Sequence, residues 1–186
     1  MEKSKEIMYG KIQGFLDSIA LTNSIFNYYV GYTFEFYKIE YNQNLISSVR
    51  NHIFDAYKTY LKINCQSKDN EIIFNFDNNF NLEKIDNWEE RLKLELPQWF
   101  MINSLKQYEN SEKTIFNNNI FKNISIIAET FIDYLKEFFD TNKLEVWEFN
   151  SYFKNNLIYF WGGLSYSDYI FSFQEDIYIL HLDFVD

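Results

Sequence analysis

The 186-residue chain contains one Cys, one Pro and five Gly. Because a disulfide needs two cysteines, the lone Cys65 excludes an internal disulfide framework and fits a reducing compartment. The scarcity of Pro and Gly favours regular helices and strands joined by short loops. No stretch approaches the roughly 18 apolar residues that a membrane-crossing helix needs, and the N-terminus lacks the apolar core of a signal peptide. We therefore expect a cytoplasmic protein that does not cross a membrane.

Motifs of catalysis and cofactor binding are also missing. The phosphate-binding patterns GxGxxG and GxxxxGK[ST] do not occur, and the two glycines of "WGGL" (161–164) indicate a turn or bulge. Cys65 has no CxxC partner, and His52, beside apolar Ile53 on a predicted helix, is expected to be structural. The sequence therefore predicts no catalytic residue, no metal site and no cofactor.

Negative charge is concentrated towards the C-terminus. Residues 1–128 carry 16 acidic and 14 basic side chains, a net charge of −2, whereas residues 129–186 carry 11 acidic and 3 basic ones, a net charge of −8. One interpretation is ordinary solubility, and the other is a negative surface that meets a basic partner. Direct nucleic-acid binding is not expected, because it requires a basic surface.

The first 140 residues are predicted to be rich in helix. Helical spacing runs from Met8 to Ile19, over residues 44–62 with Asn42 or Asn44 as the cap, and over residues 120–140. Asp86 and Glu89 form a potential capping box for a further helix, which we expect to break at Pro97 and to resume to about residue 108.

Strands are predicted chiefly near the C-terminus. The stretches "KLEVWEF", "LIYFW", "DYIFSF" and "DIYILHLDF" follow the last helix, and "EIIFNF" (71–76) is a short strand followed by an Asn-rich turn. Residues 26–41 favour a strand, with a helix as the alternative. These elements predict an α+β fold: one globular domain, helix-rich over 1–140 and β-rich over 141–186, ending in an antiparallel hairpin.

The last 22 residues hold the candidate site. If Glu175 and Asp176 form a two-residue loop, the hairpin pairs Phe173 with Tyr178 and collects its large apolar side chains on one face of the sheet. The other face then carries His181, and Asp168 lies opposite Asp183. Such facing carboxylates destabilise a sheet by up to about 1 kcal/mol unless His181 is protonated, a metal binds or a partner supplies a cation. Alternatively, strand pairing ends before this point and the aspartates are solvated.

Acidic charge beside aromatic side chains is typical of protein inhibitors of basic targets, because carboxylates steer association and Tyr and Trp anchor it. In size, charge and composition the chain resembles the small acidic immunity proteins of bacteria. That resemblance implies binding to a cognate toxin, often a nuclease, in the cytoplasm. The alternative is a non-catalytic subunit of a larger complex or a homodimeric interaction domain. The predicted partner-binding residues are Trp161, Tyr166, Asp168, Glu175, Asp176, His181, Asp183 and Asp186.

Overall fold

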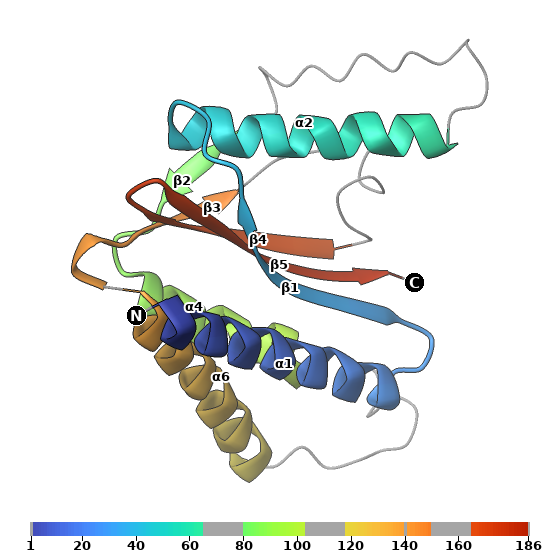
Figure 1. Cartoon of the computed structure of the whole chain (residues 1–186). Coiled ribbons are helices and arrows are strands. Elements are labelled where there is room, and N and C mark those ends of the chain that lie inside the picture. The colour runs from blue at the N-terminus through green and yellow to red at the C-terminus, as the bar shows by residue number, and fades with distance from the viewer. Residues whose placement is uncertain (1, 65–79, 103–117, 140, 150–164, 186) are drawn as a thin grey trace.

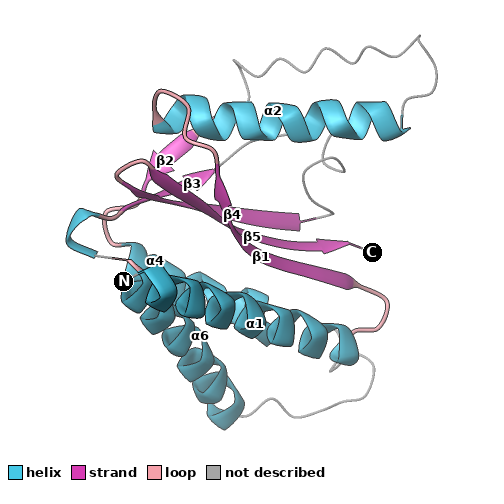
Figure 2. Ribbon diagram, in the orientation of Figure 1, coloured by secondary structure: helices cyan, strands magenta, loops and turns pink. Residues whose placement is uncertain are grey.

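The structure is a computed structural model that describes residues 2–64, 80–102, 118–139, 141–149 and 165–185 (Figure 1). Its centre is a five-stranded antiparallel sheet with the strand order β1-β5-β4-β3-β2. Helices α1, α4 and α6 cover one face of this sheet, and α2 covers the other (Figures 1 and 2). The strands are β1 (Gly31–Ile39), β2 (Leu82–Lys84), β3 (Glu145–Phe149), β4 (Ser165–Phe173) and β5 (Asp176–Val185).

The predicted α+β class is confirmed. The helices are α1 (Glu2–Phe26), α2 (Leu45–Asn64), α4 (Trp88–Pro97) and α6 (Asn118–Phe138), with a π-helical turn at Gln98–Ile102 and a 3₁₀ turn at Thr141–Lys143. The C-terminal hairpin is present, and the preferred strand in residues 26–41 is also correct. That strand, β1, pairs with β5 and so joins the N-terminal third of the chain to its C-terminus. The short β2 was not predicted, and the predicted strands at 71–76 and 157–161 lie outside the described residues.

Helix α1 forms in spite of Gly10 and Gly14, which lower helix propensity. Its buried stripe consists of Met8, Ile12, Leu16 and Ile19, as the spacing predicted. Helix α2 begins after Asn44, whose side-chain oxygen accepts a hydrogen bond from the backbone N–H of Ser47 at 2.9 Å. Asn44 is therefore the cap of α2, one of the two candidates in the sequence.

Helix α4 departs from the prediction at both ends. Its cap is Asn87, which makes no side-chain capping bond, so the predicted capping box of Asp86 and Glu89 does not form. Pro97 is the last residue of α4, and the helical backbone continues directly into the π-helical turn at Gln98. The predicted break at Pro97 is therefore absent. The kink comes at Met101, where the backbone is extended at a φ of 162°. Pro97 has no backbone N–H, so it cannot donate the hydrogen bond that would continue the α-helical pattern at this position.

The hairpin between β4 and β5 has the predicted faces but not the predicted register. Phe171 pairs with Tyr178 and Phe173 with Asp176, a shift of two residues, so the loop is Gln174-Glu175. Gln174 adopts a left-handed φ of 58°, which a tight hairpin turn requires. Because side chains alternate with a period of two, this shift leaves every side chain on its predicted face.

The two faces of the sheet bury different side chains. Towards α1, α4 and α6 lies a large core rich in aromatic rings, in which Phe36 stacks on Tyr178 at 5.2 Å between centroids. Towards α2 lies a smaller, mainly aliphatic cluster in which Val49 and Ile53 of α2 meet Ile39, Phe149, Ile170, Ile177 and Ile179 of the sheet. This second cluster covers only part of the α2 face.

Candidate functional site

The rest of the α2 face carries two rows of polar side chains. In the first row, Glu35 of β1 lies across from His181 of β5, which lies across from Asp168 of β4. In the second row, Asp183 of β5 lies between Thr33 of β1 and Tyr166 of β4. Each row therefore crosses the same three neighbouring strands, and strand register alone brings together residues far apart in the sequence.

Asp168 and His181 form a buried pair at the centre of these rows. The Nδ1–H of His181 donates a hydrogen bond to Oδ1 of Asp168 across 2.6 Å, and the side-chain exposed fractions are 7% and 0%. A contact this short is typical of a charge-assisted bond. The Tyr166 ring, on the same strand as Asp168, lies 6.5 Å from the His181 ring between centroids, with 28° between the ring planes.

The surrounding carboxylates determine the charge of His181. Burial alone lowers the pKa of the imidazole, but Asp168, Asp183 and Glu35 outweigh burial, and the net pKa is raised. The raised pKa favours the protonated imidazole, which the neighbouring carboxylates stabilise.

The side chains opposite these rows are neutral. The pKa of His52 on α2 is lowered, chiefly by burial, although Asp55 and Asp168 oppose the shift. Burial also raises the pKa of Tyr37, with further contributions from Asp168 and Glu35. The Tyr37 and His52 rings lie 5.5 Å apart between centroids and link β1 to α2. A neutral phenol and a neutral imidazole thus face the polar rows.

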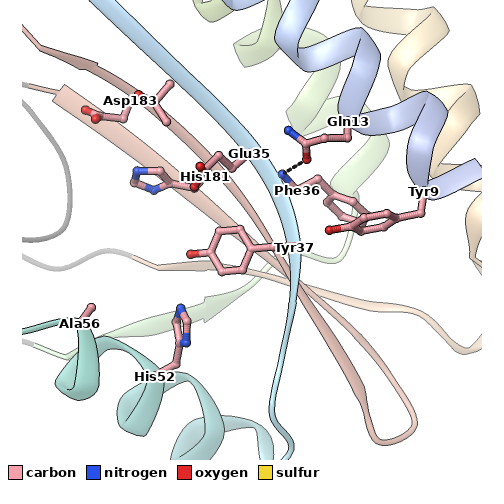
Figure 3. A pocket seen from close by; sticks show the side chains of 10 residues that line it. Tyr9, Gln13, Glu35, Phe36, Tyr37, His52, Ala56, His181 and Asp183 are labelled. Atoms are coloured by element: carbon pink, nitrogen blue, oxygen red, sulfur yellow. Dashed lines mark hydrogen bonds between the residues drawn. The ribbon is translucent and has the colours of Figure 1, made fainter. Parts of the chain in front are cut away.

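These groups line a cavity of about 600 Å³, which we call the β1 recess. Figure 3 shows that its lining comes from both sides of β1: Glu35, Tyr37, His181 and Asp183 lie on the side of α2, and Tyr9 and Gln13 on the side of α1. The recess therefore follows the outer edge of the sheet. Its described lining is Tyr9, Gln13, Thr33, Glu35, Phe36, Tyr37, His52, Ala56, His181 and Asp183.

Gln13 protects the exposed edge of β1. Its side-chain oxygen accepts a hydrogen bond from the backbone N–H of Phe36 at 3.2 Å, drawn as a dashed line in Figure 3. An unpaired strand edge invites pairing with another chain, and a side chain that satisfies an edge amide reduces that tendency. The recess is thus open to ligands, while the backbone edge beside it is partly covered.

Chemically, the recess is suited to holding a cation. Its described lining contains the carboxylates of Glu35 and Asp183 and no Lys or Arg. Among the residues that the structure describes, no group of three or more His, Cys, Asp and Glu side chains is placed to hold a metal ion. An Asp-oriented His can also act as a general base, but nucleophilic catalysis needs an activated partner, and the raised pKa of Tyr37 opposes activation of that hydroxyl.

The predicted partner-binding residues that the structure describes do not form one exposed surface. Asp168, His181 and Asp183 are buried, with residue exposures of 0%, 5% and 6%. The predicted opposition of Asp168 to Asp183 is wrong, because Asp168 faces His181, and solvation of Asp168 is wrong as well, because strand pairing continues to Ser165. The cause is the hairpin loop, which lies one residue earlier than predicted.

The remaining predicted residues lie in different places. Tyr166 is half-buried beside His181, and Glu175 is exposed in the hairpin loop. Asp176 forms ion pairs with Lys5 of α1 and Lys38 of β1, which lower the pKa of its carboxyl chiefly through the Lys38 hydrogen bond. Trp161 and Asp186 lie outside the described residues.

Sequence reasoning missed the contribution of β1 and α2 to this site. Glu35, Thr33 and Tyr37 reach the recess because β1 pairs with β5, a contact that joins residues about 145 positions apart. The alternation "TFEFY" carried a signal, since Glu35 lies between two buried phenylalanines and must point to the opposite face. Neither the pairing of β1 with β5 nor the placement of His52 over it follows from local sequence.

Comparison with known proteins identifies no family. No family model matches the chain, and no curated protein matches it. Two crystal structures of citrus MAF1 are similar in outline. One is 10% identical with a TM-score of 0.40 and covers 92% of this chain and 98% of its own; the other is 12% identical with a TM-score of 0.38 and covers 84% and 88%. Values this low have no bearing on function.

Proposed function

We propose that the protein is a non-catalytic inhibitor that binds a basic protein partner directly in the cytoplasm. The class that fits is the bacterial immunity protein, which neutralises a cognate toxin, with nucleases among the candidate targets. Part of that setting agrees with the structure, because no helix among the described residues is long and apolar enough to cross a membrane.

The observation that carries this proposal is the presence of two acidic side chains in the β1 recess. Glu35 is exposed at its rim and Asp183 is 94% buried within it, so the recess presents carboxylates at two depths. A cationic side chain of a partner would meet Glu35 first and Asp183 after losing its water. Charge pairs of this kind, partly removed from solvent, are the ones that contribute to slow dissociation.

The whole chain adds long-range attraction. Its net charge of −10 draws a positively charged protein towards it and speeds their encounter, an effect that falls as salt rises. The rings of Tyr9 and Tyr37 beside the carboxylates supply rigid contact area, which is typical of the few residues that dominate binding energy. General charge would therefore set the association rate, and the recess would set the residence time.

The first experiment is a toxicity test in cells. The reading frame immediately upstream of this gene is expressed alone and together with the protein. We expect the upstream product to arrest growth and co-expression to restore it. If the upstream product is harmless, or if co-expression does not rescue growth, the inhibitor proposal fails. The alternative, a subunit of a larger complex or a homodimer, would then be tested by light scattering on the purified chain.

A second experiment locates the contact once a partner has been found. Association and dissociation rates are measured at several salt concentrations for the wild type and for Glu35→Gln. We expect Glu35→Gln to dissociate several-fold faster and to show a shallower salt dependence. Asp133→Asn serves as the control. Asp133 is an exposed residue of α6, so this variant removes the same charge on the opposite side of the sheet.

A further inference from the structure

We propose that the outward face of helix α1 binds the same face of a second copy of this chain, with the two helices antiparallel. The protein is then a two-fold symmetric dimer. This face, which we call the α1 seam, consists of Ile7, Gly10, Gly14, Leu21 and Ile25. The seam shares no residue with the described lining of the β1 recess, so the inference does not depend on the inhibitor proposal.

The seam presents a row of exposed apolar side chains. The exposed fractions of Ile7, Leu21 and Ile25 are 56%, 65% and 69%. At 3.6 residues per turn, these three positions point within about 40° of one another around the helix axis. They lie on the side of α1 opposite to Ile12 and Leu16, which are fully buried in the core. Single exposed apolar residues are ordinary, but an aligned row of them is typical of an interaction surface.

Two glycines in the same row allow a close approach of another helix. Glycine is the least favourable helix residue after proline, yet Gly10 and Gly14 both lie inside α1. A Cβ atom added at either position would meet no described atom within 4 Å, apart from the neighbouring backbone of α1 itself. Within the described residues, the small size of these glycines therefore serves no packing contact. It would let the backbone of a second helix pack closely against this face.

The sequence of α1 is self-complementary about Gly14. In an antiparallel pair with its two-fold axis at Gly14, residues equally far before and after this position lie level with each other. Gly14 then faces Gly14 of the second copy. Ile7 and Leu21, seven residues to either side, lie level across the seam, as do Lys11 and Asp17, three residues to either side. The pair therefore matches apolar with apolar side chains and a cation with an anion.

Charge favours this pairing over the other arrangements of two α1 helices. Lys11 and Asp17 are both exposed, and Oδ1 of Asp17 accepts a hydrogen bond from the side-chain amide of Gln13 at 3.1 Å. A parallel pair would place like charges level with each other, and an axis near Asp17 would bring two carboxylates together. A strongly basic or strongly acidic partner would meet one like charge at this face. A second copy meets opposite charges at both contacts.

The test uses two charge reversals that should fail alone and succeed together. In a dimer of Lys11→Glu, each of the two contacts would join two carboxylates, and in a dimer of Asp17→Lys each would join two ammonium groups. In a mixed dimer with one chain of each variant, both contacts join opposite charges. The mass of the purified full-length protein is measured by light scattering and sedimentation over a range of concentrations, for each variant and for their equal mixture.

We expect the wild type to reach twice the mass of the chain as its concentration rises. Each reversal should raise the dissociation constant of the dimer at least several-fold, and the mixture should return it towards the wild-type value. These differences should shrink in high salt. Lys122→Glu, at an exposed position of α6, is the matched control and should dimerise like the wild type.

Gly14→Gln tests the close approach of the two helices. Glutamine favours helix more than glycine does, and its side chain would point into open space in a single chain. This variant should therefore keep or raise the thermal unfolding temperature while it raises the dissociation constant of the dimer several-fold. A loss of dimer with no loss of stability separates blocked contact from misfolding.

Three results would overturn the inference: a wild type that stays monomeric at every concentration, a dimer that these variants leave unchanged, or a mixture that associates no more tightly than either variant alone. The proposed function fails separately. If a monomeric protein neutralises the upstream toxin, the inhibitor stands and the α1 dimer falls. If the dimer forms through α1 but no toxin is neutralised, the dimer stands and the inhibitor proposal falls.

Discussion

The two faces of the β-sheet differ in the side chains that they bury, although the same strands supply both. Towards α1, α4 and α6 the sheet buries a continuous aromatic core, which includes Phe36, Phe171 and Tyr178. Towards α2 it buries aliphatic side chains at one end and the polar rows of Glu35, His181 and Asp183 at the other. Successive residues of one strand point to opposite faces of the sheet. The strands that carry the polar rows therefore also carry the apolar side chains of the aromatic core. A face that could bury apolar side chains instead holds charges.

Under the proposed function, this difference places stability mainly on one face and binding on the other. Apolar burial contributes about 25 cal/mol per Å² removed from water, whereas a buried ion pair returns little or nothing after its desolvation cost. We therefore expect substitutions on the aromatic face to act on folding and substitutions at the polar rows to act on ligand binding.

The largest effect is expected from Phe36→Ala on the aromatic face. Phe36 is fully buried and contacts the rings of Phe138, Phe139, Phe171 and Tyr178. Its truncation should lower the free energy of unfolding by about 3–5 kcal/mol, as measured by denaturant titration. Phe54→Ala on α2 is the control, since Phe54 is 39% exposed, and it should cost less than about 1 kcal/mol. Equal losses in the two variants would contradict the division between the faces.

The next effect concerns the buried pair on the other face. Asp168→Ala removes the carboxylate that bonds to His181 and should cost about 3 kcal/mol, because it leaves a buried imidazolium without that partner. The double variant Asp168→Val/His181→Leu removes the pair and should recover more than half of this loss. Its unfolding free energy is measured in the same titration. If the double variant is no more stable than Asp168→Ala, the pair itself is a main source of stability.

The pair also predicts a dependence on pH. The pKa of His181 is raised in the folded chain, so its contribution to stability is fully present below about 6.5, the unfolded value. That contribution is lost as pH rises through the folded pKa. Unfolding free energies measured between pH 5.5 and pH 9 should therefore fall with pH in the wild type by more than in Asp168→Val/His181→Leu. Parallel curves for the two proteins would show that His181 does not titrate with a raised pKa.

The smallest effect is expected from Asp176→Asn, at the start of β5. Its side chain is 32% exposed and forms ion pairs with Lys5 and Lys38. Exposed pairs are weak, so the loss should be about 0.5–1 kcal/mol at low salt and should shrink in high salt. The lowered pKa of this carboxyl gives the opposite dependence on pH from that of His181. Its contribution is present above about 3.8 and is lost as pH falls through the folded pKa.

The features that depend on one segment, namely strand faces and helix stripes, could be predicted from the sequence. Alternation predicted which face each residue of β4 and β5 occupies, and helical spacing predicted the buried stripes of α1 and α6, because each depends on a period within one segment. The hairpin register could not be fixed, since Gln174-Glu175 and Glu175-Asp176 are equally unusual two-residue loops. That choice moved Asp168 from a place opposite Asp183 to one opposite His181.

The order of the strands in the sheet could not be predicted from the sequence in the same way. Glu35 faces His181 only because β1 lies beside β5, and the sequence contains no periodic signal for strand order. The predicted acidic surface thus became a recess, and its most exposed carboxylate came from a strand that had not been considered for the site. The net charge of the last third indicated acidic side chains near the C-terminus, but it did not indicate their placement beside β1.

We propose that the β1 recess, and not the negative charge of the chain as a whole, contacts a basic partner. The most direct measurement compares Glu35→Lys with Asp133→Lys for rescue of growth from the upstream toxin, with equal amounts of folded protein. Each variant changes the net charge by the same amount, one at the recess and one on α6. The account predicts that Glu35→Lys loses rescue and Asp133→Lys keeps it. Equal rescue by both variants would contradict it.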